Sequence, residues 1–240
     1  MKTGLTAPRE EAVPLNVCVR HVEFYFSRRD DFMTPRRLFA VIPAAGHSRR
    51  MGTHKLLLSL GGETVIQRLI HGLATPWITR TVIVARGGDE ALAAHLAGED
   101  VELVQPEVDP PDMKASVQAG LQWIETHYAP TEEDSWLLIP ADHPVLKRTL
   151  IERLCEVWSQ SDARILIPSF EGKKGHPAFF RWSVAREVFQ LGAAQGINAL
   201  WKEGSAAPVL WECDDPEILI DLDTPADLEA VRARYASDFE

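Results

Sequence analysis

Short apolar runs alternate with segments of helical periodicity along most of this chain. The apolar runs, bounded by Gly, Pro or charged residues as expected for strands buried on both faces, occupy residues 38–43, 81–85, 101–104, 136–140 and 164–168. Apolar residues three and four positions apart, typical of amphipathic helices, occur at 63–73, 89–98, 116–128 and 146–158. This β-α-β-α order predicts an α/β fold with a mostly parallel sheet and helices on both faces.

The first 36 residues do not continue this pattern. Alternating apolar residues at 17–26 hint at a short strand, but a charged stretch follows at 28–31. Chain termini are often poorly ordered unless they are tied to a core. We therefore predict an N-terminal extension, flexible in character, over 1–36 and a functional domain over 37–240.

The composition narrows the class of protein. Apolar residues make up 45% of the 240 residues, which is enough for a sizeable core, and no apolar run approaches the roughly 20 residues that span a bilayer. Three cysteines without metal-ligand spacing argue against a disulfide scaffold and for a reducing, cytoplasmic location. The net charge of −10 argues against broad binding to nucleic acid or to a membrane surface. A small anionic ligand would therefore need locally clustered cations.

Such a cluster follows the first predicted strand, in the loop 43–55. Ala44, Ala45 and Gly46 are small and let a ligand approach the backbone closely. A hydroxyl group and three cations come next, at Ser48, Arg49, Arg50 and Lys55. These groups predict an anion cradle suited to a polyphosphate, although the spacing matches neither the common phosphate loop nor GxGxxG. The alternative is a solvated basic loop.

Carboxylates follow two later strands. Asp142 comes directly after the strand at 136–140, and Asp221 and Asp223 come after a strand expected at 218–220. Carboxylates at strand ends suit Mg²⁺, which bridges one or two of them to substrate phosphates. We expect only one of the later pair to face the site and favour Asp223, with Asp221 as the second candidate.

Two structural alternatives concern these acidic segments. Asp142 could instead cap the helix at 146–158. Thr224 and Pro225 form a good helix start, so Asp227 in the first turn is interpreted as part of a capping box and not as a ligand.

The loop sequence A-A-G-x-S-x-R-M-G-x-x-K, here residues 44–55, resembles the signature loop of MobA-like nucleotidyltransferases. The resemblance implies a Rossmann-like three-layer α/β/α sandwich that binds a nucleoside triphosphate. It places Arg50 and Lys55 on the phosphates and Ala44, Ala45 and Gly46 beside the base and ribose. One departure is Pro43, where the family usually has Leu.

Further motifs fit the same family in the same order along the chain. Asp142-His143-Pro144 resembles its Asp-x-Pro turn, and 221–228 resembles its D-x-D-T-P-x-D-L segment, which implies metal ligation by Asp142 and Asp223. Residues 112–121 resemble its G-M-x-x-S helix start, with Ser116 toward the nucleotide and Asp112 replacing the usual Gly. Gly175-His176-Pro177 resembles a turn that borders the acceptor in the molybdenum-cofactor branch.

The resemblance implies an enzyme with Mg²⁺ as cofactor and with Arg50, Lys55 and Asp142 in catalytic roles. It would transfer a nucleoside monophosphate, favoured as that of CTP, to a phosphorylated acceptor such as molybdenum-bound molybdopterin. Guanylyl transfer to the same pterin and nucleotidyl transfer to a sugar phosphate are alternatives. A non-catalytic nucleotide-binding maturation partner of a molybdoenzyme is the alternative from another class.

Overall fold

The computed structural model describes residues 36–47, 51–202 and 207–236. The predicted N-terminal extension, with its apolar alternation at 17–26, therefore lies outside the described residues except for Arg36. No helix in the described ranges combines the length and the hydrophobicity needed to cross a membrane.

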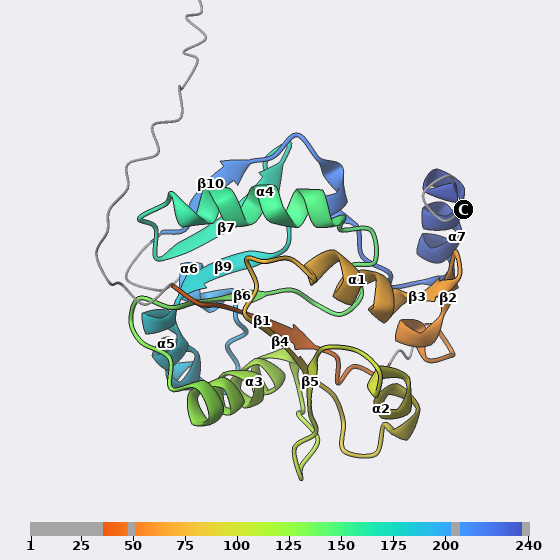
Figure 1. Ribbon diagram of the computed structural model, residues 1–240, viewed down its shortest axis with the longest axis horizontal. Helices are drawn as coiled ribbons and strands as arrows, with labels where there is room; N and C mark the ends of the chain where they lie inside the picture. Colours follow the sequence, from red (N-terminus) through yellow and green to blue (C-terminus); the bar gives the residue numbers. More distant parts are fainter. Residues whose placement is uncertain (1–35, 48–50, 203–206, 237–240) are drawn as a thin grey trace, which may run out of the picture. The chain divides into compact units, whose positions relative to one another are not determined.

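An eight-stranded sheet forms the centre of the domain, in the order β10-β7-β9-β6-β1-β4-β5, with β8 paired to β7 (Figure 1). The strands are β1 (Leu38–Pro43), β4 (Arg80–Val84), β5 (Glu102–Val104), β6 (Ser135–Leu138), β7 (Ile165–Phe170), β8 (Lys173–Lys174), β9 (Ala178–Arg181) and β10 (Val209–Glu212). β1 pairs in parallel with β4 on one side and with β6 on the other. β9 runs antiparallel to β6 and β7. The order reverses beside β1, where ligands of open α/β sheets bind.

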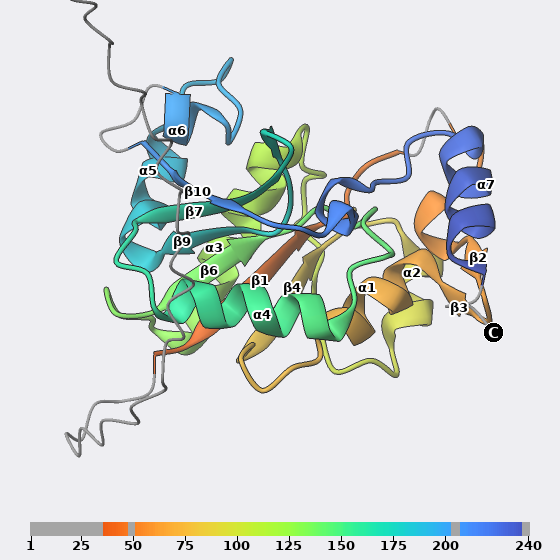
Figure 2. The same ribbon diagram turned by 90° about the horizontal axis from the view of Figure 1, so that it is seen from above.

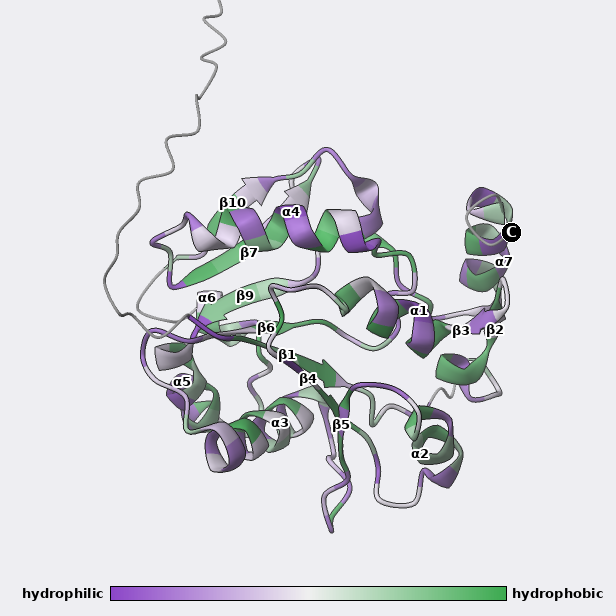
Figure 3. Ribbon diagram, viewed as in Figure 1, coloured by the Kyte–Doolittle hydropathy of each residue, from purple (hydrophilic) through white to green (hydrophobic). Residues whose placement is uncertain are grey.

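Helices cover both faces of this sheet, as the sequence pattern predicts. α1 (Val65–Leu73) and α4 (Arg148–Ser159) lie on one side, and α3 (Met113–Tyr128) and α5 (Ala185–Gln190) lie on the other (Figure 1). Figure 3 shows the resulting pattern, with β1 and β7 largely hydrophobic and α4 alternating between hydrophobic and hydrophilic residues. The fold is thus a Rossmann-like α/β/α sandwich, as expected.

The remaining elements are short and lie around this sandwich. They are η1 (Lys55–Leu57), β2 (Ser59–Leu60), β3 (Glu63–Thr64), α2 (Glu90–Leu96), η2 (Trp182–Val184), α6 (Ala199–Lys202), η3 (Pro216–Leu219) and α7 (Pro225–Arg234). α7 lies beside the β2–β3 hairpin in Figures 1 and 2, and Arg232 of this helix donates a hydrogen bond to the Ser59 carbonyl at 3.0 Å.

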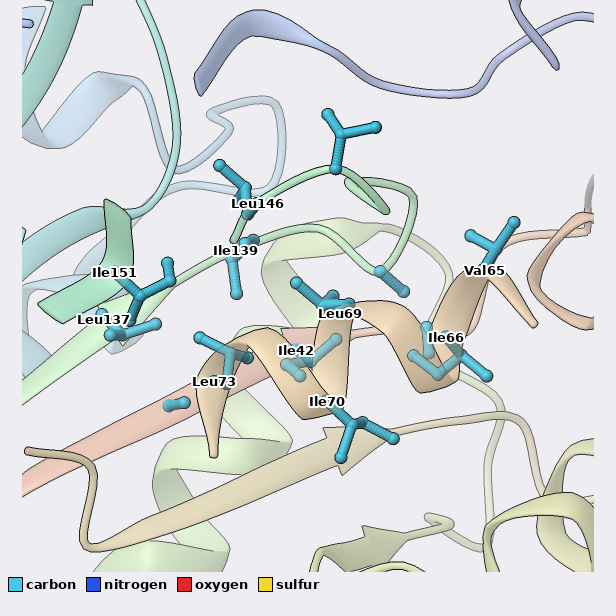
Figure 4. Close-up of a cluster of buried hydrophobic side chains, with 14 of the residues drawn as sticks. Ile42, Val65, Ile66, Leu69, Ile70, Leu73, Leu137, Ile139, Leu146 and Ile151 are labelled. Atoms are coloured by element: carbon cyan, nitrogen blue, oxygen red, sulfur yellow. The ribbon is translucent and has the colours of Figure 1, made fainter. Parts of the chain in front are cut away.

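α1 shows how local sequence specifies one of these elements. Thr64 caps the helix and forms a capping box with Gln67, which satisfies backbone groups that the first turn leaves unpaired. The face predicted from periodicity is the buried face (Figure 4), made of Val65, Ile66, Leu69, Ile70 and Leu73. Burial of each such side chain stabilises the fold by about 1.5–3 kcal/mol.

The strand expected at 218–220 is wrong. Residues Pro216–Leu219 form the 3₁₀ helix η3. Pro216 presets the backbone angle of the first helical residue, and the Asp215 carboxylate accepts a hydrogen bond from the Glu217 amide at 3.0 Å. These local start signals outweigh the β preference of the short apolar run that follows.

Gly72→Ala should destabilise the domain although alanine favours helix. A Cβ at Gly72 would lie 2.2 Å from the Leu146 carbonyl oxygen, so α1 must move away from the segment that follows Asp142. We expect a loss of about 1–3 kcal/mol in the free energy of unfolding, measured by urea titration. Gly98→Ala is the matched control, because a Cβ there meets nothing within 4 Å and should be neutral or slightly stabilising. Equal unfolding midpoints for the two variants would contradict this packing account.

Candidate functional site

The loop after β1 borders a cavity of about 320 Å³ at the point where the strand order reverses. The Ala44 amide continues the β1–β4 ladder by donating to the Val84 carbonyl at 2.8 Å, and Ala44 and Ala45 are buried. Gly46, with no side chain, lines the same cavity. Ala44, Ala45 and Gly46, predicted to lie beside the base and ribose, therefore line one cavity, and their small side chains leave the backbone accessible. Ser48 and Arg50 lie outside the described residues.

Lys55 is the cation that the structure brings to this cavity. Its Nζ lies 2.5 Å from Asp142 Oδ2 and 3.3 Å from Asp223 Oδ1, and it also donates to the Leu222 carbonyl at 3.0 Å. Burial by itself would lower the pKa of Lys55, but the charges and hydrogen bonds of Asp142 and Asp223 outweigh it, and the pKa is raised. Lys55 therefore stays charged and joins two segments that are far apart in sequence.

The backbone fixes how these two acidic segments meet. The Leu222 amide donates to the Asp142 carbonyl at 3.0 Å, and Leu222 is fully buried. Asp142 is not a helix cap, because α4 begins after Lys147, which occupies the N-cap position. Asp142 is free to present its carboxylate to the site.

Asp221 and Asp223 both line a second cavity of about 370 Å³ together with Asp142. The expectation that only one of them faces the site is therefore wrong. Side chains two residues apart in an extended segment lie on the same side, and the buried Leu222 between them points away. Burial and the negative charges of Asp142 and Asp223 raise the pKa of Asp221. Asp227 forms the predicted capping box with Thr224.

These carboxylates fit a magnesium site that is completed by a substrate. Within the described part of the chain, no group of three or more His, Cys, Asp or Glu residues is arranged to hold a metal ion without help. Mg²⁺ keeps several waters and uses one or two carboxylates plus substrate phosphates, so a complete protein cage is not required. Asp142, Asp221 and Asp223 all line the second cavity, where their hard oxygen atoms would be available to such an ion.

Ser116 lies at the wall of the first cavity, in the first turns of α3. It is buried, and its hydroxyl donates to the Asp112 carbonyl at 3.2 Å. Asp112 is the N-cap, and its carboxylate accepts a hydrogen bond from the Ala115 amide at 2.8 Å. Asp112 has an extended backbone, which any residue adopts, so the family's Gly is not required there by conformation.

The Gly175-His176-Pro177 turn borders the second cavity through Gly175 and His176. A Cβ at Gly175 would lie 2.7 Å from the Ile218 carbonyl, so only glycine fits against this segment. The His176 ring packs edge-on against His143, with 4.9 Å between the ring centroids. Burial, reinforced by the charge of His143, lowers the pKa of His176 to about 3, so the imidazole is neutral. The turn is near the carboxylates, while its role toward an acceptor remains a prediction.

Sequence reasoning missed a group that holds the loop in place. His54 Nε2 lies 2.9 Å from the Asp89 carboxylate, and Arg86 Nη2 lies 3.3 Å from the same group. Asp89 also caps α2 through the Leu92 amide. Burial tends to raise the pKa of Asp89, but its hydrogen bonds with His54 and Leu92 lower it overall. Asp89 followed by Glu90 is a recognisable helix-capping signal in the sequence. The contact between Asp89 and His54 has no such signal.

The fold is that of Rossmann-like nucleotidyltransferases, and it brings Lys55 together with Asp142 and Asp223. The family model described as the MobA-like NTP transferase domain matches residues 40–208, and the chain belongs to this family.

Two relatives and one solved structure illustrate the similarity. A molybdenum cofactor guanylyltransferase of Rhodopseudomonas palustris (strain HaA2) is 27% identical over 197 residues, which are 79% of this chain and 88% of that protein. A molybdenum cofactor cytidylyltransferase of Escherichia coli (strain K12) is 24% identical over 196 residues, which are 81% and 95% of the two chains. A 4-diphosphocytidyl-2C-methyl-D-erythritol synthase shares the fold, with a TM-score of 0.67, 20% identity and coverage of 84% and 99%.

Asp89→Asn should destabilise the protein at neutral pH more than in acid. We expect a loss of about 1–2 kcal/mol at pH 7 from the weakened charge-assisted contacts with His54 and Arg86, measured by urea unfolding. Because the folded-state pKa of Asp89 is depressed, its contribution is present above the unfolded value of about 3.9 and is lost as the pH falls through the folded value. The difference between wild type and variant should therefore shrink at about pH 3. A difference that grows in acid would contradict the assignment.

Proposed function

We propose that this enzyme transfers a nucleoside monophosphate from a nucleoside triphosphate, with CTP favoured, to a phosphorylated acceptor, with Mg²⁺ as cofactor. The proposed acceptor is molybdenum-bound molybdopterin, and pyrophosphate is the second product. One observation carries the proposal: Lys55 and Asp142 line the cavity beside the small-residue loop, and Lys55 joins Asp142 to Asp223.

In this proposal the triphosphate lies along the loop after β1. Ala44, Ala45 and Gly46 border the nucleoside, and Ser116 lines the same cavity. Lys55 carries a full positive charge and reaches the phosphates, with Arg50 as a further cation of the loop. Three or four negative charges on the triphosphate need these cations, because the protein as a whole carries −10.

Asp142 and Asp223 are the residues that would hold Mg²⁺. When bound, the ion neutralises charge that develops on the phosphate oxygens. Asp221 adds negative charge at the same edge and strengthens the attraction for a cation.

The reaction itself requires positioning and charge stabilisation. A phosphate oxygen of the acceptor attacks the α-phosphorus in line, a new P–O bond forms, and the bond to the leaving pyrophosphate breaks. Phosphate monoesters have a second pKa of about 6, so the attacking oxygen is largely ionised at neutral pH and needs no general base. This agrees with the buried His143 and His176, whose pKa values are both lowered mainly by burial.

Separate observations support the choice of nucleotide and the choice of acceptor. The Gly-His-Pro turn beside the carboxylates favours the molybdenum-cofactor branch and, within it, cytidylyl transfer. The Rhodopseudomonas relative is named a guanylyltransferase, so GTP is the alternative donor. A sugar-phosphate-type acceptor is a further alternative, supported by the shared fold with the erythritol-phosphate enzyme. Pyrophosphate release from CTP, GTP, ATP and UTP, each assayed with molybdopterin, its molybdenum-loaded form and methylerythritol phosphate, decides among these.

Asp142→Asn should abolish Mg²⁺-supported pyrophosphate release while the protein stays folded. The amide keeps the shape of the side chain but removes the charge that binds the metal, and we expect a fall of about 10²-fold or more in kcat. Circular dichroism and the unfolding midpoint report the fold. Glu156→Gln, a change at an exposed position on α4, is the control and should leave turnover unchanged. Retained turnover in Asp142→Asn would refute its metal role.

Lys55→Gln should act in opposite directions on nucleotide and metal. Loss of the cation should weaken binding of the magnesium–CTP complex by about tenfold or more, measured by calorimetry. Without nucleotide, the same variant should bind Mn²⁺, used as an electron paramagnetic resonance probe, more tightly than wild type, because the ammonium no longer neutralises Asp142 and Asp223. Lys173→Gln, at an exposed lysine on β8, should change neither value. Weaker Mn²⁺ binding in Lys55→Gln would contradict competition between the two cations.

A further inference from the structure

Lys114 is a buried cation that the proposed reaction does not use. It stands in the first turn of α3, and only 8% of its surface is exposed. Its ammonium donates hydrogen bonds to the carbonyls of Gly192 at 2.6 Å and Ala193 at 3.2 Å. An ammonium has three donors, so these two bonds leave one of them over.

The charge of Lys114 has no ionic partner in the described part of the chain, where no carboxylate lies within ion-pair distance. A buried charge is unfavourable unless it is paired. Its position adds a second unfavourable interaction, because the N-terminal end of a helix already carries positive partial charge. The Asp112 carboxylate, which caps this helix, offsets only part of the repulsion between Lys114 and the helix end. An anion beside Lys114 would pair with the buried charge and also reduce this repulsion.

A third cavity, of about 420 Å³, gives such an anion a place. Lys114 lines it together with Leu138, His176, Ile197 and Trp201. It shares Met113 and His176 with the second cavity, which Asp142, Asp221 and Asp223 line and which we call the carboxylate cavity, so the two cavities adjoin. Its apolar and aromatic side chains suit a planar ring, and the polar side chains of Asp112, Gln195 and Asn198 also line it.

A second cation lies where the two cavities adjoin. Lys174 lines the carboxylate cavity, and its Nζ lies 5.8 Å from the centroid of the Trp201 ring. Lys174 is exposed and, among the described residues, makes no ion pair. The acidic end of the cleft at Asp142 and Asp223 is thus opposed by a basic end at Lys114 and Lys174.

We propose that Lys114 binds a second anionic group of the acceptor, distinct from the phosphate that attacks the nucleotide. The proposal rests on the proposed function, and it specifies the acceptor as a molecule with a flat ring system between two anionic ends. The body lies against Trp201 and Ile197, and Lys174 assists at the cleft. Gly192 and Ala193 hold the ammonium in place through their carbonyls.

The first test needs no turnover. Inorganic phosphate is titrated into protein saturated with magnesium and a non-hydrolysable CTP analogue, and the indole resonance of Trp201 is followed by NMR. Lys114→Gln removes the charge but keeps an amide donor for the loop carbonyls, and it should weaken phosphate binding about tenfold or more. Lys114→Arg should restore binding to within about threefold, because charge and donors are retained. Lys173→Gln should match wild type.

Unchanged phosphate affinity in Lys114→Gln would overturn the proposal, and so would equal losses in Lys114→Gln and Lys114→Arg, which would identify a tether for the 192–193 loop. Unfolding midpoints of all variants show whether the loop contact is preserved. If Lys114→Gln does not fold, the comparison of Lys114→Arg with wild type in 50 and 500 mM NaCl replaces it; affinity that does not fall with salt would refute a charge-based site.

The second test separates this proposal from the proposed function. With the acceptor that the nucleotide panel identifies, Lys114→Gln should raise the KM for acceptor about tenfold and leave the KM for CTP unchanged. Absence of turnover in wild type with every acceptor, combined with Lys114-dependent phosphate binding, would refute the proposed function and keep the anion site. Normal acceptor KM in Lys114→Gln would refute the site and keep the function.

Discussion

The contact of one ammonium with two carboxylates organises the functional end of this domain. Lys55 follows the first strand, Asp142 follows the fourth strand of the parallel core, and Asp223 lies near the C-terminal helix, yet all three meet within 3.3 Å. Without Lys55, three neighbouring carboxylates would repel one another at a partly buried strand edge. Their proximity is therefore stable only with a cation present. In the protein alone that cation is Lys55; in the proposed complex Asp142 and Asp223 would hold Mg²⁺, and Lys55 would contact the phosphates.

The parallel sheet makes this convergence possible. β4 and β6 flank β1, so the segments after β1 and β6 leave the same edge of the sheet next to each other. Helix α3 packs closely on the face of β1 and β4, since a Cβ at Gly120 would lie 2.9 Å from the Val41 side chain. Its N-terminal end thereby brings Ser116 to the first cavity and Lys114 to the third. A single helix thus serves both ends of the cleft.

Much of the fold was predictable, because strands buried on both faces and amphipathic helices leave strong periodic signals. The buried face of α1 and the capping box at Thr224 were read correctly from spacing and cap residues. The prediction at 218–220 was wrong because Pro216 and Asp215 start a 3₁₀ turn that a short apolar run does not reveal. Lys55 and Asp142 were correctly placed together by strand-end reasoning. His54 with Asp89, and Lys114 with the carbonyls of 192–193, depend on tertiary contacts between loops that have no pattern in sequence.

The main-chain bond between Leu222 and Asp142 has a consequence for how this scaffold diversifies. Because amide and carbonyl are common to almost every residue, substitutions nearby leave the spacing of the two acidic segments intact. Among the described residues, the wall at 193–201 makes no main-chain hydrogen bond to the acidic segments and can vary more readily. Evolution can accordingly exchange one acceptor for another at the rim while the machinery for phosphate chemistry is inherited unchanged.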